Sequence, residues 1–68
     1  MDLNKRISIE LMVYDMIEKI AEKFEVTQKD DFEQEVYMEL CDIFDTCFID
    51  EQIQDFYCDN PEWEEANE

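Results

Sequence analysis

The sequence predicts an all-α protein, a small three-helix bundle with a short C-terminal helical extension. Two observations carry this prediction. Apolar residues recur every three or four positions along most of the 68-residue chain, which is helical spacing. The chain also has no Gly, so the dipeptides of tight β-hairpins are absent, and only residues 3–9 alternate apolar and polar side chains. Because a chain of this length supports one small core, we expect a single domain.

The first helix is predicted over residues 8–25, with Ser8 as its N-cap. Its apolar positions fall on one arc of a helical wheel and should face the core. They are Ile9, Val13, Met16, Ile17, Ile20 and Phe24. Ile7 and Leu11 lie away from this arc, so we expect them outside the core.

The second helix is predicted over residues 28–48, because Thr27 and Asp30 resemble a capping box at its start. Its apolar face is broad and needs neighbours on two sides. An inner row and a parallel row make up this face: Phe32, Val36, Leu40, Ile43 and Cys47, then Tyr37, Cys41, Phe44 and Phe48.

A third helix is predicted over residues 50–58, capped by Asp50 and closing over the second. Asn60 and Pro61 are typical of a new helix start, so a short helix or tail follows in residues 60–68. Trp63 should pack back onto the bundle, because a small core recruits every large ring.

The composition argues against an enzyme and against a bound cofactor. The chain has no His, the commonest general base, and no Gly for a phosphate-binding loop. Its three cysteines lack metal-ligand spacing, so we expect free, partly buried thiols and no metal: Cys41, Cys47 and Cys58. No apolar stretch approaches the length of a membrane span, and the N-terminus does not resemble a signal peptide, which predicts a cytoplasmic protein.

The charge is large and unevenly placed: 21 acidic against 5 basic residues give a net charge of −16. Six of the acids and all five bases precede residue 30, so residues 30–68 carry 15 acids and no base. Acids three or four residues apart form rows on the second and third predicted helices. These rows are the predicted partner-binding surface: Asp31, Glu35, Glu39, Asp42, Asp45, Glu51, Asp55 and Asp59.

Rows of carboxylates at helical spacing have a charge density comparable with that of DNA phosphates. In charge and size the chain resembles the small acidic DNA-mimic inhibitors that phages and mobile elements use against restriction, CRISPR or DNA-repair enzymes. That resemblance implies a phage-type counter-defence protein, such as an anti-CRISPR or anti-restriction protein. Its partner would be a basic, nucleic-acid-binding protein, with no direct binding to nucleic acid or membrane.

Three other interpretations remain open from sequence alone. The acids could form an ordinary solvated surface. The broad apolar face could dock into a larger assembly as a helical adaptor or subunit, or pair in a homodimer. In the adaptor, the interface residues would be Phe32, Tyr37, Phe44, Phe48, Phe56 and Trp63. Clustered carboxylates could attract cations, but parallel helical side chains cannot wrap an ion, so only loose binding is expected. The first discriminating property is the salt dependence of partner binding.

Overall fold

The protein is all-α, as the sequence predicts, in the computed structural model, which describes residues 2–65. No strand occurs within these residues. The elements are α1 (Leu3–Ala21), a 3-10 turn η1 (Val26–Gln28), α2 (Lys29–Leu40), α3 (Thr46–Asp59) and α4 (Pro61–Glu65).

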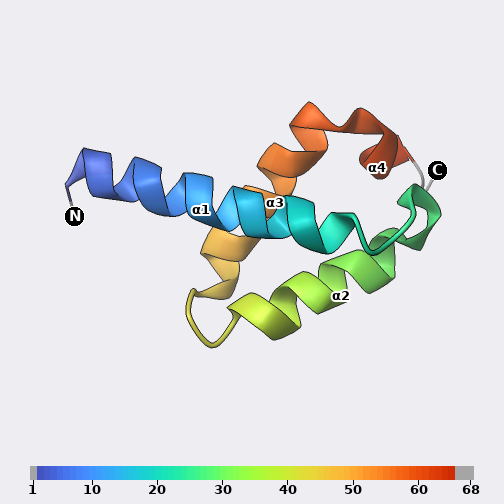
Figure 1. Cartoon of the computed structure of the whole chain (residues 1–68), viewed down its shortest axis with the longest axis horizontal. Coiled ribbons are helices and arrows are strands. Elements are labelled where there is room, and N and C mark those ends of the chain that lie inside the picture. Colours follow the sequence, from blue (N-terminus) through green and yellow to red (C-terminus); the bar gives the residue numbers. More distant parts are fainter. Residues whose placement is uncertain (1, 66–68) are drawn as a thin grey trace.

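The helices form a compact bundle in which α1 crosses α3 and α2 packs against both (Figure 1). Helix α4 turns back at the end of α3 and packs against that helix and η1. The N-terminal turns of α1 project beyond the other helices, which makes the molecule elongated, about 38 by 23 by 19 Å (Figure 1). At the crossing, the side of α1 that carries Tyr14 and Glu18 faces the C-terminal half of α3, where the candidate site is found.

The core is aromatic at its centre. Phe32 is fully buried, and its ring lies 5.3 Å from that of Phe56 and 4.8 Å from that of Trp63, centroid to centroid. Trp63 packs onto the bundle, as predicted, and is only 7% exposed. The other buried apolar residues are Val13, Ile17, Ile20, Ala21, Val36, Leu40, Ile49, Ile53 and Tyr57.

The predicted start of the first helix at Ser8 is wrong. The helix begins at Leu3, and its N-cap is Asp2, whose carboxylate accepts a hydrogen bond from the Asn4 backbone N–H at 3.3 Å. Ser8 lies inside the helix and donates its hydroxyl to the Asn4 carbonyl. The apolar arc could not reveal the first turns because they project from the bundle and bury no face.

The helix also ends at Ala21 rather than at residue 25, and Thr27 does not cap the next one. Thr27 lies in η1, and the N-cap position of α2 is Gln28, whose side chain makes no capping hydrogen bond. The apolar pattern continues through this connection because Phe24, in a bend, and Val26, in η1, still pack against the core from outside the α-helices. Periodicity alone therefore placed the boundary too late.

The long second helix predicted over residues 28–48 is divided in the structure. Helix α2 stops at Leu40, a turn follows, and Asp45 caps α3 by accepting from the Phe48 N–H at 2.8 Å. Asp50, the predicted cap, lies inside α3. Apolar residues in the turn maintain helical spacing across the break, so the spacing did not reveal the end of α2. One of these residues, Ile43, is 66% exposed and lies outside the core.

The predicted broad apolar face is accordingly divided between two helices. Phe44 and Phe48 stack on each other with ring centroids 5.2 Å apart and are half-buried against the core. The three cysteines are free thiols, but they are exposed rather than partly buried. Ile7 and Leu11 lie outside the core, as the helical wheel predicts.

Candidate functional site: an acidic double pocket between α1 and α3

The structure separates the predicted acidic surface into parts. Asp31, Glu35 and Glu39 lie along α2, where Glu35 is half-buried and the other two are exposed. Because α2 ends at Leu40, Asp42 and Asp45 do not continue this row. Asp42 is exposed in the turn, Asp45 caps α3, and the three remaining acids are exposed on α3: Glu51, Asp55 and Asp59.

The row on α2 and the row on α3 face different sides of the molecule. Glu33 accepts a hydrogen bond from the Tyr57 hydroxyl, and Tyr37 donates to Asp50, so this flank of α2 faces α3. At 100° per residue, Glu35 and Glu39 lie on the opposite flank of α2. The two rows are therefore not one continuous band of carboxylates.

The row on α3 instead meets acids of α1. Two adjoining pockets, of about 380 and 290 Å³, lie between these helices and share Tyr14 and Asp59. We call them together the acidic double pocket. Its carboxylates come from Glu10 and Glu18 of α1, from Glu22 directly after that helix, and from Asp55 and Asp59 of α3. Among the described residues, no Lys or Arg lines either pocket.

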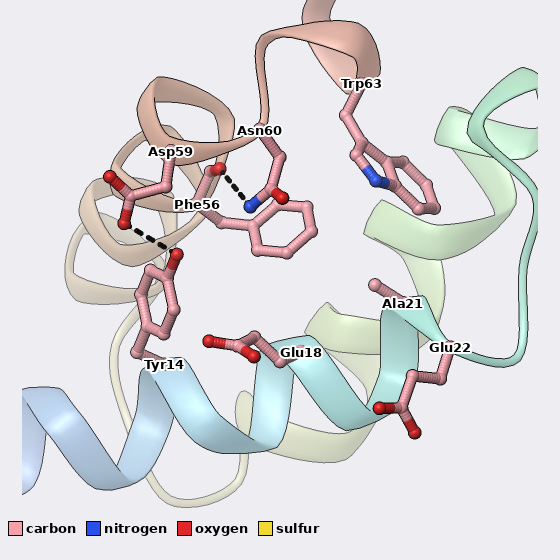
Figure 2. Close-up of a pocket in the computed structure, with 8 residues that line it drawn as sticks. All are labelled: Tyr14, Glu18, Ala21, Glu22, Phe56, Asp59, Asn60 and Trp63. Carbon is pink, nitrogen blue, oxygen red and sulfur yellow. Dashed lines mark hydrogen bonds between the residues drawn. The ribbon is translucent and has the colours of Figure 1, made fainter.

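A tyrosine–carboxylate hydrogen bond divides the two pockets. The Tyr14 hydroxyl donates to the Asp59 carboxylate at 2.7 Å, which ties α1 to the end of α3 (Figure 2). The larger pocket continues from this bond toward Trp63, with the Phe56 ring between them and the Glu18 carboxylate beside Tyr14 (Figure 2). Asn60 donates its side-chain amide to the Phe56 carbonyl at 2.9 Å, which fixes the turn between α3 and α4. The larger pocket thus combines aromatic walls with an acidic rim.

Sequence reasoning missed the part of this site that α1 supplies. Residues 1–29 are almost neutral in sum, so the charge distribution predicted an acidic surface only on the later helices. Tyr14, Glu18 and Glu22 follow one another at steps of four, so the spacing did place them on one side of the helix. Only the crossing of α1 over α3 brings these acids opposite Asp55 and Asp59.

Little of the acidic charge is neutralised inside the molecule. Within residues 2–65 there are two ion pairs, Arg6 with Glu10 and Lys19 with Asp15, and both lie within α1. Lys29, the last base of the chain, places its ammonium 4.6 Å from the centroid of the Tyr57 ring. The carboxylates of α2, α3 and α4 therefore have no ion-pair partner in the described part of the chain.

All three tyrosines donate to carboxylates, and each has a raised pKa. Burial, the hydrogen bond to Asp59 and its charge raise the pKa of Tyr14 to about 12. The hydrogen bond to Asp50 followed by burial raises the pKa of Tyr37 to about 12. Burial and then the hydrogen bond to Glu33 raise the pKa of Tyr57 well above its ordinary value. Neutral phenols thus hold the helices together beside negative charges.

This arrangement predicts a loss of stability at alkaline pH. Because folding raises the tyrosine pKa values, their contribution is complete below the unfolded value of about 10 and is lost as pH rises through the folded values. Tyrosinate absorbance, titrated in buffer and in concentrated urea, should show fewer ionised tyrosines in the folded protein above pH 10. Tyr14→Phe is the control and should remove one delayed titration. Coinciding folded and unfolded curves would contradict these hydrogen bonds.

The described residues contain no group of three or more His, Cys, Asp or Glu placed to hold a metal ion. In the same part of the chain, no helix is long and apolar enough to cross a membrane.

Comparison with known proteins finds no matching family model, curated protein or solved structure. The charge and geometry of the chain itself are therefore the basis for its proposed function.

Proposed function

We propose that this protein is a non-enzymatic, acidic binding protein of the DNA-mimic type, which occupies the basic nucleic-acid-binding groove of a target protein and inhibits it. The observation that supports the proposal most strongly is the uncompensated charge. Residues 30–65 carry 14 acids and no base, and none of these acids forms an ion pair with another described residue. A partner rich in Lys and Arg would supply the missing positive charge.

The physical mechanism is competition by charge. Carboxylates steer a basic groove toward the protein through long-range attraction, as phosphates do, and the complex releases the counterions of both surfaces. The side of the molecule that carries the acidic double pocket suits this role best, because α1 and α3 contribute carboxylates from two helices. The row of Asp31, Glu35 and Glu39 gives the other side a second acidic surface.

We propose the same cellular setting that the charge and size imply. The target would be a cytoplasmic nucleic-acid enzyme of a defence system, and the protein a phage or mobile-element inhibitor of the anti-CRISPR or anti-restriction kind. It would bind the enzyme in place of DNA and make no direct contact with nucleic acid, whose phosphates its carboxylates repel. A homodimer remains compatible with this role.

The adaptor interpretation loses most of its proposed contact surface. Phe32, Phe56 and Trp63, which it requires at an interface, are buried in the protein's own core. Tyr37, Phe44 and Phe48 are half-buried against that core. The aromatic residues on which this interpretation depends therefore do not favour it.

The proposal is tested by capturing partners from lysate with the tagged protein at about 100 mM and about 500 mM salt, since phosphate-like binding weakens steeply with salt. We expect a nucleic-acid-binding enzyme that is retained only at the lower salt concentration. A partner retained equally at both concentrations, and lacking any nucleic-acid site, would contradict the mimic function.

A further inference from the structure

The N-terminal turns of α1 carry an apolar stripe that the rest of the described chain leaves exposed. Leu3, Ile7 and Leu11 are 68%, 44% and 66% exposed. Their spacing of four residues places them on one side of the helix, and Figure 1 shows these first turns projecting beyond the other helices. Short runs of helix are marginal without a packed face, and a contiguous apolar surface typically marks a contact site. We call these three residues the α1 stripe.

The charge beside the α1 stripe favours an acidic partner. Residues 2–9 carry two bases and one acid, whereas residues 10–65 carry 19 acids and three bases. Arg6 and Glu10 lie on one flank of the stripe, where the Arg6 Nε donates to the Glu10 carboxylate at 3.0 Å. Among the described residues no other carboxylate engages Arg6, so its two Nη atoms can donate to a second one.

We propose that the N-terminal turns of α1 pair antiparallel with those of a second copy of the chain, in a symmetric homodimer. With Ile7 at the two-fold axis, Leu3 of each copy lies against Leu11 of the other. The two stripes then cover each other along their whole length. A second copy therefore supplies an apolar surface of matching length.

The same pairing brings opposite charges together. A two-fold axis places matching flanks of the two helices side by side. Arg6 of one copy then lies opposite Ser8 of the other, two residues or about 3 Å along the helix from Glu10. The long Arg6 side chain spans this offset, so each copy offers a carboxylate to the guanidinium of the other.

The antiparallel arrangement also limits repulsion between two acidic chains. Because the pair is centred on the projecting turns, the other helices of the two copies lie at its opposite ends (Figure 1). A parallel pair would place both acidic bodies at one end and would set Arg6 beside Arg6. The inference is independent of the proposed function, whose partner should bind more weakly as salt rises.

Sedimentation equilibrium of the purified protein measures this association, with a reducing agent present because the three cysteines are exposed. We expect monomers at about 5 μM and substantial dimer at about 500 μM, since an interface this small binds weakly. The dimer should tighten between about 100 and 500 mM salt, because salt screens the repulsion between the two chains. A protein that stays monomeric at about 500 μM and 500 mM salt would overturn the proposal, and so would a dimer that weakens as salt rises.

Two matched variants separate the α1 stripe from other exposed apolar side chains. Ile7→Glu and Met38→Glu each add one negative charge at an exposed position, but Met38 lies on α2. Ile7→Glu places two carboxylates at the two-fold axis and should raise the dissociation constant of the dimer by about 100-fold or more. Met38→Glu should change it by less than about threefold. Circular dichroism establishes that both variants are folded, and equal dissociation constants for the two would refute the interface.

A mixing experiment tests the antiparallel register. Arg6→Glu gathers four carboxylates at the interface of its dimer and Glu10→Arg gathers four guanidinium groups, so each variant alone should dimerise at least about tenfold more weakly than the native chain. An equimolar mixture should associate more tightly than either variant alone, because the acidic pair of one chain then faces the basic pair of the other. Within each chain the like charges at positions 6 and 10 stay side by side, so recovery on mixing reports only on contact between chains. No recovery on mixing would refute the antiparallel pair.

Discussion

Phe32→Ala is expected to unfold much of the protein at room temperature. Phe32 is fully buried and contacts Phe56, Tyr57 and Trp63, so its removal leaves a cavity at the point where α2, α3 and α4 meet. Truncation of a buried Phe costs about 3–5 kcal/mol. A 68-residue domain has a total stability of roughly 3–10 kcal/mol at the usual stability per residue, so the loss is comparable with the whole.

Urea unfolding followed by circular dichroism measures this effect. The matched control is Met38→Ala, which truncates an exposed apolar side chain, 64% accessible, on the same helix. The control should change the free energy of unfolding by less than about 0.5 kcal/mol. Similar losses for the two variants would mean that α2 does not pack through Phe32.

Charge reversal on the acidic double pocket is expected to abolish partner binding while leaving the fold intact. The variant Glu18→Lys, Glu22→Lys, Asp55→Lys places three positive charges where the target's basic groove should dock. Because facing like charges cost several kcal/mol, the dissociation constant should rise by about 100-fold or more. Binding to the captured target is measured by calorimetry, and folding by circular dichroism.

The control carries the same change of charge on the other acidic surface. Asp31→Lys, Glu35→Lys, Glu39→Lys also brings the net charge from −16 to −10, but on the flank of α2 turned away from α3. We expect a much smaller loss of affinity from the reduced long-range attraction alone. If this control lost affinity and the first variant did not, the α2 row would be the binding surface instead.

The sequence predicts the helical class, most core positions and the short final helix, because each depends on local spacing. It wrongly places Ile43 and Cys47 in the core, where both are exposed, and it misses the fully buried Ile49. Val13, Ile17, Phe32, Val36 and Ile53 are buried at the positions that periodicity indicates. The burial of Trp63 was predictable because a small chain has few large apolar side chains and packs each of them into its core. Each of these features is determined by residues that lie close together in the sequence.

Helix ends and the site depend on information that periodicity lacks. The break after Leu40 is hidden because Phe44 and Phe48 maintain apolar spacing across a turn, although Asp45 is a recognisable N-cap. The double pocket depends on the crossing of two helices distant in sequence, so Tyr14 could not be paired with Asp59 beforehand. The net charge of each segment likewise did not indicate that acids of α1 belong to the site, because the bases of residues 1–29 nearly cancel its acids.

The central claim is that the protein takes the place of nucleic acid on its target, and competition measures this most directly. The captured target is bound to labelled DNA, the protein is titrated in, and release of the DNA is followed at several salt concentrations. The account predicts full displacement of the DNA, with an affinity that falls steeply as salt rises. A ternary complex in which the target holds DNA and protein together would contradict it.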